Sequence, residues 1–105
     1  MSGSGREAPS SWGGGGSADD CDFRLTTTLR SPNPEVVATV AVGDRLLVEV
    51  DEETPAVVVL KDGQRVGSIT ERVPKFVACG RSGHQYRAIV KSNDEGKVVV
   101  ETELR

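Results

Sequence analysis

The strongest pattern in the chain is a pair of strand-like segments separated by four polar or small residues. Residues 57–60 are all apolar, and residues 65–69 read Arg-Val-Gly-Ser-Ile. Between them, Asp62-Gly63 suits a tight hairpin turn, because Gly accepts positive φ freely and Asp tolerates it. We therefore predict a β-hairpin over residues 56–70. Its first strand has no polar face, so we expect this strand to be covered on both sides.

Four other segments alternate between apolar and polar side chains, which is typical of strands with one buried face. They are residues 23–30, 45–51, 85–91 and 97–104. In the hairpin, Gly67 predicts a bulge or a close approach of another backbone. The residues expected to face the core are Phe23, Leu25, Thr27, Leu29, Leu46, Val48, Val50, Tyr86, Ala88, Val90, Val98, Val100, Thr102 and Leu104.

Residues 34–40 predict a short helical turn. Asn33 is a favourable capping residue, Pro34 suits the first helical position, and Glu35 is an acid near the positive end of the helix dipole. The β-branched residues that follow would serve a strand equally well.

A second helix is predicted near the middle of the chain, where Val73, Phe76 and Val77 fall at helical spacing. We expect Thr70 to cap this helix and Gly80 to end it. About six short strands with one or two helical turns predict a mainly β fold. We expect a small six-stranded barrel or a curled antiparallel sheet.

Composition agrees with a β fold of modest size. Sixteen of the 105 residues are Val, which favours strands, and only 4% are aromatic. Residues 1–20 contain six of the twelve glycines, and such a segment buries too little apolar surface to offset its ordering entropy. We predict a disordered tail at residues 1–20 and one domain at residues 21–105. Trp12 in the tail is either an exposed linker residue or an anchor for a protein partner or for the chain's own surface.

Membrane and metal partners are not expected. No apolar run approaches the roughly 20 residues that span a bilayer, and the N-terminus lacks a signal pattern, so we predict a cytoplasmic protein. In that compartment we expect Cys21 and Cys79 to be free thiols. The alternative is a disulfide that joins the start of the domain to its middle. These two residues and His84 cannot fill a four-ligand zinc site, and no cofactor is predicted.

The charges are unevenly distributed along the chain. Residues 19–60 carry three basic and nine acidic side chains, a net charge of −6, whereas residues 61–91 carry seven basic and two acidic side chains, a net charge of +5. A clustered basic face binds phosphates even on an acidic protein. The alternative is that the charges of the two halves pair across neighbouring strands. The candidate nucleic-acid-binding residues are Arg65, Arg72, Lys75, Arg81, His84, Arg87 and Lys91.

Four short motifs follow one another in a characteristic order and spacing. They are Gly43-Asp44-Arg45-Leu46, Ala56-Val57-Val58-Val59, Val66-Gly67-Ser68-Ile69 and Gly83-His84-Gln85-Tyr86-Arg87-Ala88-Ile89-Val90. From about Leu25 to the C-terminus, the chain resembles a HIRAN domain, a small β-barrel found alone in bacteria and fused to helicases in eukaryotes. The resemblance implies nucleic-acid recognition, with single-stranded 3′ ends bound in the helicase-fused cases. The chain departs from the family pattern at residues 51–55 and at Ser68.

No residue pattern predicts catalysis. His84 lacks a paired nucleophile, and Glu101 and Glu103 lie on an outward face with no sign of an apolar pocket around them. We therefore predict a non-catalytic binding module that recognises nucleic acid, single-stranded or at an end, through the basic second half. The alternative is a protein-interaction adaptor that uses a strand edge or the Trp12 tail.

Overall fold

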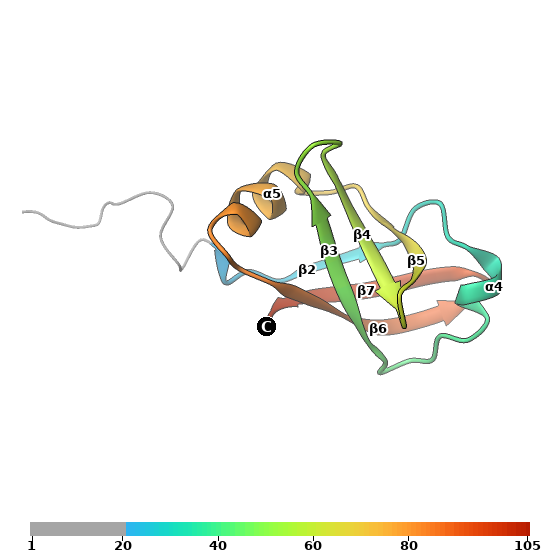
Figure 1. Cartoon of the computed structure of the whole chain (residues 1–105). Helices are drawn as coiled ribbons and strands as arrows, with labels where there is room; N and C mark the ends of the chain where they lie inside the picture. The colour runs from blue at the N-terminus through green and yellow to red at the C-terminus, as the bar shows by residue number, and fades with distance from the viewer. Residues whose placement is uncertain (1–20) are drawn as a thin grey trace, which may run out of the picture.

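The computed structural model describes residues 21–105, so Trp12 and the predicted tail at residues 1–20 lie outside the described residues. Six antiparallel strands form one sheet in the order β2-β7-β6-β3-β4-β5, and two short helices accompany it (Figure 1). The mainly β, curled-sheet prediction is confirmed. The elements are β2 (Leu25–Thr28), α4 (Pro34–Val37), β3 (Arg45–Asp51), β4 (Ala56–Lys61), β5 (Gln64–Ile69), α5 (Val73–Arg81), β6 (Tyr86–Asp94) and β7 (Lys97–Leu104).

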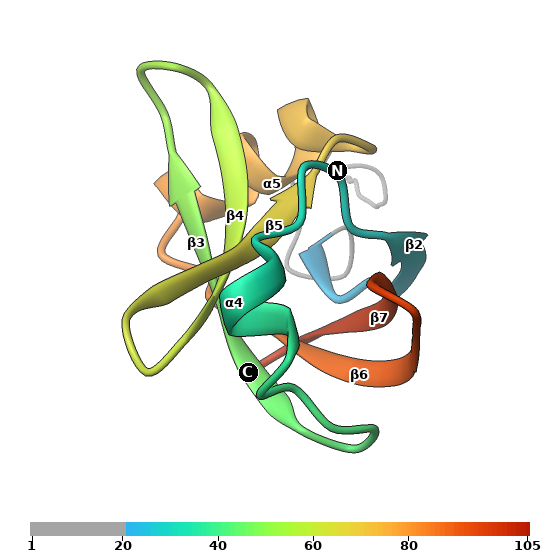
Figure 2. The same ribbon diagram turned by 90° about the vertical axis from the view of Figure 1, so that its right-hand side faces the viewer.

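The sheet curls into a half-barrel, which brings the segment after β2 at one edge against β5 at the other edge (Figure 2). Arg30, just after β2, forms a backbone bridge with Ser68 on β5, with N···O distances of 2.8 and 2.9 Å. Gly67 lies at this crossing, where a Cβ atom would stand 3.0 Å from Leu29 Cβ and 3.2 Å from the Arg30 carbonyl oxygen. The β4–β5 register also shifts beside Gly67. Both expectations for this glycine, a bulge and a close approach, are confirmed.

The predicted β4–β5 hairpin is present, with φ of 51° at Asp62 and 80° at Gly63. The expectation that β4 is covered on both sides is wrong. Val57 and Val59 are buried, whereas Val58 and Leu60 on the opposite face are only partly buried. The sheet curls around a single core, so only the concave face of β4 is covered.

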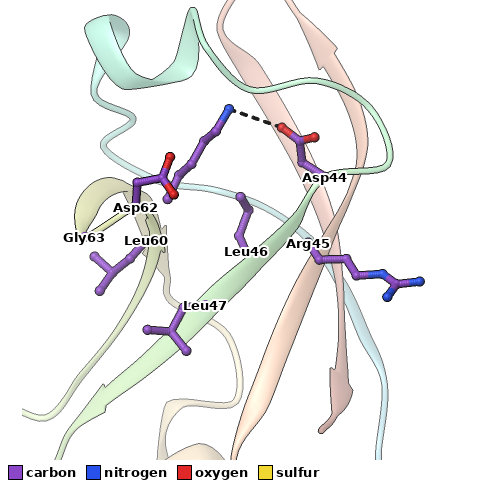
Figure 3. A pocket seen from close by; sticks show the side chains of 8 residues that line it. Asp44, Arg45, Leu46, Leu47, Leu60, Asp62 and Gly63 are labelled. Carbon is purple, nitrogen blue, oxygen red and sulfur yellow. Dashed lines mark hydrogen bonds and ion pairs between the residues drawn. The ribbon is translucent and has the colours of Figure 1, made fainter.

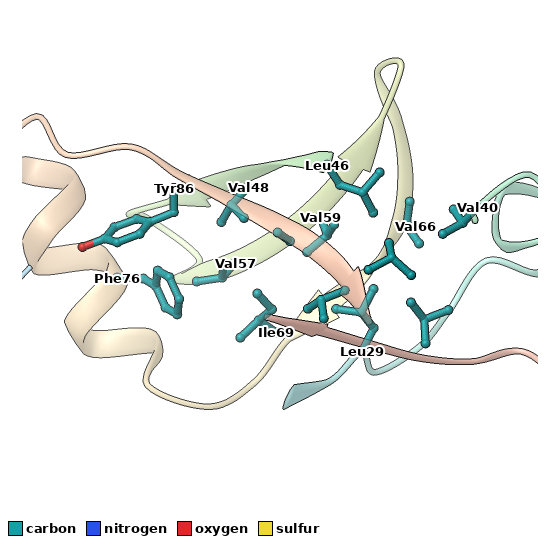
Figure 4. Close-up of a cluster of buried hydrophobic side chains, with 14 of the residues drawn as sticks. Leu29, Val40, Leu46, Val48, Val57, Val59, Val66, Ile69, Phe76 and Tyr86 are labelled. Atoms are coloured by element: carbon teal, nitrogen blue, oxygen red, sulfur yellow. The ribbon is translucent and has the colours of Figure 1, made fainter. Parts of the chain in front are cut away.

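The core consists mainly of the inward-facing residues of the strands, and the two helices α4 and α5 add buried residues to it (Figure 4). Ala88 and Val90 on β6 and Val98 and Val100 on β7 are each 1% exposed or less. Leu25, Val50 and Leu104 at the strand ends are partly buried against this core. The predicted inward faces are therefore confirmed.

The helix α4 begins as predicted, since the Asn33 side chain accepts a hydrogen bond from Glu35 N at 3.2 Å. It covers four residues rather than the seven predicted, because β-branched residues favour leaving the helix. Neither α4 nor α5, the helices within residues 21–105, is long and apolar enough to cross a bilayer.

The helix α5 differs from the prediction at both ends. Its N-terminal boundary is Arg72, which has φ of 58° and no side-chain cap, so the expected Thr70 cap is wrong. Gly80 lies inside the helix rather than ending it, and the chain reverses at Gly83, where φ is +91°. The left-handed conformation that ends the segment falls three residues later than expected, at the glycine that accepts it without strain.

The expectation of two free thiols is wrong. Cys21 and Cys79 form a disulfide with a Cα–Cα distance of 5.6 Å, as in the alternative considered above. The pairing follows from packing that residue spacing does not show, because Phe23 packs at a tilted angle against Phe76 and Tyr86, with ring centroids 5.1 and 5.3 Å away. The Tyr86 hydroxyl also donates a hydrogen bond to the Cys21 carbonyl oxygen. The segment before β2 is therefore held against α5 by both covalent and aromatic contacts.

Candidate binding surface on the outer face of the sheet

Leu47 on β3 is the centre of the best candidate site. Its side chain points away from the core and is 45% exposed, although it lies in the middle of the sheet. Its cross-strand neighbours are Leu60 on β4 and Arg87 on β6. Three hollows in the surface include Leu47 in their lining. We refer to Arg45, Leu47, Glu49, Leu60, Arg87 and Arg105 as the Leu47 surface.

The first hollow, of about 250 Å³, is lined by Arg45, Leu46, Leu47, Arg87 and Arg105, and we call it the arginine hollow. Within residues 21–105, neither Arg45 nor Arg105 makes an ion pair. Arg87 Nε lies 2.9 Å from Glu103 Oε2, but its N–H does not point at that oxygen, so the contact is an ion pair without a hydrogen bond. Three arginines therefore line one hollow together with the exposed Leu47, and the carboxylate of Glu103 lies beside one of them.

The second hollow, of about 280 Å³, exists because β3 leaves β6 soon after the two strands pair. Their pairing covers only residues 45–47 of β3, whereas β3 continues beside β4 as far as Asp51. We call this opening the notch hollow. It is lined by Leu47, Val48, Glu49, Val50, Glu52, Gly80, His84, Gln85, Tyr86 and Arg105.

The third hollow, of about 430 Å³, lies between the start of β3 and the β4–β5 turn (Figure 3). Its one lysine is already occupied, since Lys61 Nζ lies 3.4 Å from Asp44 Oδ2 and donates a hydrogen bond to the Thr39 carbonyl oxygen. The Ala41 N–H, which donates to Asp44 Oδ2 at 2.9 Å, lowers the pKa of Asp44, and Lys61 lowers it further. The charged groups Lys61 and Asp44 of this hollow are therefore already engaged with each other and with neighbouring backbone groups.

The seven candidate residues from the sequence do not form one surface. Arg87 and Lys91 share the outer face of β6, where they pair with Glu103 and Glu101 at 2.9 and 3.3 Å. Arg81 lies at the end of α5, with Nε 3.0 Å from Glu52 Oε1. Two ion pairs, Arg81–Glu52 and Lys61–Asp44, join the acidic and basic halves of the chain, but they do so from the segments that flank β3 and not across two neighbouring strands as the alternative expected.

The remaining candidates have other local partners. Arg65 Nη2 donates to Ser68 Oγ at 2.9 Å, and Lys75 Nζ lies 4.4 Å from the centre of the Phe23 ring. Arg72 precedes α5, and His84 lines the notch hollow with Nδ1 3.2 Å from the Cys79 carbonyl oxygen. Of the seven, only Arg87 lines the arginine hollow and only His84 lines the notch hollow.

Sequence reasoning missed Arg45 and Arg105. Alternation along residues 45–51 places Arg45 on the outward face, so the sequence pattern alone marks this arginine as exposed. Arg105 follows β7, and its N–H donates to the Gln85 carbonyl oxygen at 2.8 Å. Its position beside Arg45 and Arg87 depends on the β3–β6–β7 pairing, which the sequence pattern does not contain.

Aromatic rings contribute little to the outer face. Phe23, Phe76 and Tyr86 pack against one another beneath α5, and Phe76 and Tyr86 are at most 1% exposed. Guanidinium planes are therefore the groups available to stack on a base, a role they fill in single-strand recognition. Within the described residues, no group of three His, Cys, Asp or Glu side chains is placed to hold a metal ion.

A further hollow, of about 570 Å³, lies between β2 and the end of β5 and is lined by Thr27, Thr28, Arg30, Thr70, Glu71 and Lys97. It combines two basic side chains with one acidic one and has no apolar floor comparable to Leu47.

The chain matches no protein-family model, no curated protein and no solved structure. Functional inference therefore rests on the residues of the chain itself.

Proposed function

We propose that residues 21–105 form a non-catalytic binding module that holds single-stranded nucleic acid by its phosphates at the arginine hollow. The observation that carries this proposal is the convergence of Arg45, Arg87 and Arg105 around Leu47. The resemblance to HIRAN domains supports the same class of ligand. Under this proposal the phosphate site is the outer face of β3 and β6 rather than the whole basic half of the chain.

The chemistry of the hollow suits a phosphodiester with its attached sugar and base. Guanidinium groups donate paired hydrogen bonds to phosphate oxygens and stack on planar rings. Glu103 holds Arg87 from one side, which limits the entropy that this arginine loses on binding. Leu47 offers an apolar contact between the charged groups. Glu49 and Glu52 line the neighbouring notch hollow and restrict the phosphate site to the arginine side.

The test is fluorescence anisotropy of labelled single-stranded, double-stranded and 3′-overhang DNA over a range of salt concentrations. The double variant Arg45→Gln/Arg105→Gln is compared with the control Arg65→Gln/Arg72→Gln, which removes the same charge outside the hollow. We expect the first variant to lower the slope of log affinity against log salt by about 1.4, because each lost phosphate contact on a single strand contributes about 0.7. The control should lose much less.

Two results would contradict the proposal. Equal losses in both double variants would mean that binding follows total charge and not the hollow. Absence of binding at low salt would remove nucleic acid as the ligand. A preference for the 3′ overhang would extend the HIRAN resemblance to the bound end.

The protein-interaction adaptor remains the second candidate because of two observations. Leu47 is 45% exposed, and β3 beyond Leu47 pairs with β4 alone, which leaves part of a strand edge open. In this case Leu47→Asp would abolish capture of a partner while all DNA probes fail to bind. The version that uses Trp12 concerns residues outside the described part of the chain and is tested by deleting residues 1–20.

A further inference from the structure

We infer that the notch hollow receives one base of the bound strand and favours cytosine over uracil through the carboxylate of Glu49. This inference rests on the proposed function, since the base must belong to the strand whose phosphates occupy the arginine hollow. It adds a base preference to a site that would otherwise recognise only the backbone.

The two hollows are neighbours on one surface. Leu47 and Arg105 line both of them, so a ligand at the arginine hollow reaches the notch hollow without crossing another element. Base and phosphate of one nucleotide lie only a few bonds apart. Arg105 is thus placed to contact either the phosphate or the edge of the base.

The size of the notch hollow indicates a single small group. Its volume of about 280 Å³ lies below the 300–1,000 Å³ typical of sites for drug-sized ligands. An added peptide strand would need several residues to fit between β3 and β6, whereas a base is one flat ring system. Of its apolar lining residues, Leu47 is exposed and Val50 is partly exposed, so these two side chains are available to contact such a ring.

The polar residues that line the notch hollow supply both hydrogen-bond acceptors and hydrogen-bond donors. The carboxylate of Glu49 only accepts hydrogen bonds, and within the described residues it makes no ion pair. When His84 Nδ1 carries the proton that bonds the Cys79 carbonyl oxygen, its Nε2 is an acceptor as well. Arg105 supplies donors only.

Cytosine and uracil differ in the hydrogen-bonding group at C4 of the ring. Cytosine presents an amino donor at C4 beside ring acceptors, which matches a lining that includes both a carboxylate and a guanidinium. Uracil presents a carbonyl oxygen at C4, so two acceptors would face each other across the site. Two acceptors facing each other repel and lose a hydrogen bond, whereas a good base contact discriminates by about fivefold or more.

The experiment compares oligo-dC with oligo-dU of equal length, and oligo-rC with oligo-rU, by anisotropy at one low salt concentration. The two members of each pair share a backbone and differ in the base. We expect the native chain to bind the cytosine member about tenfold more tightly, and Glu49→Gln to reduce this ratio to about two or less. Glu71→Gln, which removes an exposed carboxylate far from the notch hollow, is the matched control and should keep the ratio.

The other possible outcomes distinguish a failure of the base preference from a failure of the proposed phosphate site. Salt-dependent binding with equal affinity for cytosine and uracil would overturn the base preference and leave the phosphate site standing. Loss of the preference in both glutamate variants would overturn the role of Glu49. Failure of every oligonucleotide to bind would overturn the proposed function together with this inference, and binding of the DNA pair alone would restrict the ligand to DNA.

Discussion

Cys21 and Cys79 lie 58 residues apart in the sequence, yet their Cα atoms are 5.6 Å apart and their sulfur atoms are bonded. The bond joins the segment before β2 to the last turn of α5. The same two segments also meet through Phe23 and Phe76. The helix that lies beside the notch hollow is thus fixed to the start of the domain at more than one point.

Removing this disulfide should destabilise the domain substantially. Closing a loop of this length restricts the unfolded chain, which corresponds to about 4 kcal/mol in the chain-entropy model. We expect a reducing agent to lower the urea midpoint of the native chain. The variant Cys21→Ala/Cys79→Ala should show a low midpoint that does not respond to the reductant. Equal midpoints for the oxidised and reduced native chain would show that the bond contributes nothing to stability.

The disulfide also bears on where the protein resides. Disulfides are typical of oxidising compartments and rare in the cytoplasm, so the bond does not support the cytoplasmic location, which stays a prediction.

Tyr86 should titrate above the ordinary range for a phenol. Burial raises the pKa of Tyr86, and the negative charge of Asp22 raises it further. The neutral phenol therefore stabilises the fold fully at pH values below the ordinary tyrosine pKa of about 10, and this contribution is lost as the pH rises through the folded-state pKa. The chain has one tyrosine and its two cysteines are bonded, so phenolate absorbance reports this group alone. A folded-state midpoint equal to that of the urea-unfolded chain would contradict the prediction.

Local sequence patterns were sufficient to predict most of the strands and turns of the fold. The alternation in residues 97–104 identified β7, and Asp62-Gly63 identified the β4–β5 turn, because both signals depend only on neighbouring residues. The one-sided burial of β4 was missed, since an all-apolar strand does not reveal how many layers cover it. The disulfide was missed because it depends on a contact across 58 residues.

The candidate site was only partly accessible from the sequence. Arg87 was identified as outward-facing from the alternation along its strand. Its meeting with Arg45 and Arg105 depends on which strands are neighbours and in what register, so charge counts along the chain could not show it. The same counts grouped Arg72 with Arg87, although the two residues lie on different elements.

Asp44 should stabilise the turn before β3 in a pH-dependent manner. Its pKa is lowered mainly by the Ala41 N–H and also by Lys61, so the ionised form is favoured in the folded state. Its contribution is present above the unfolded pKa of 3.8 and is lost as the pH falls through the lower folded-state pKa. We therefore expect Asp44→Asn to lower the thermal midpoint at neutral pH and to have little effect in acid. Asp62→Asn at the hairpin turn is the control, and an equal loss from Asp44→Asn at both pH values would contradict the prediction.

Two glycines should respond in opposite directions to the same substitution. A Cβ atom at Gly67 would lie 3.0 Å from Leu29 Cβ and 3.2 Å from the Arg30 carbonyl oxygen, at the bridge that joins the outermost strands. We expect Gly67→Ala to destabilise the domain by about 1–3 kcal/mol, because neither neighbour can move without disturbing that bridge.

Gly80 provides the matched comparison. It lies within α5, and the nearest atoms to an added Cβ belong to Val50 at 3.8 Å, which is an ordinary contact. Gly80→Ala should therefore stabilise the domain by about 0.4–1 kcal/mol, because alanine restricts the unfolded chain and favours the helix. Urea unfolding of both variants measures the two effects under the same conditions. If Gly67→Ala proves as harmless as Gly80→Ala, β2 and β5 separate readily, and the half-barrel is held by its core and disulfide rather than by the meeting of its outermost strands.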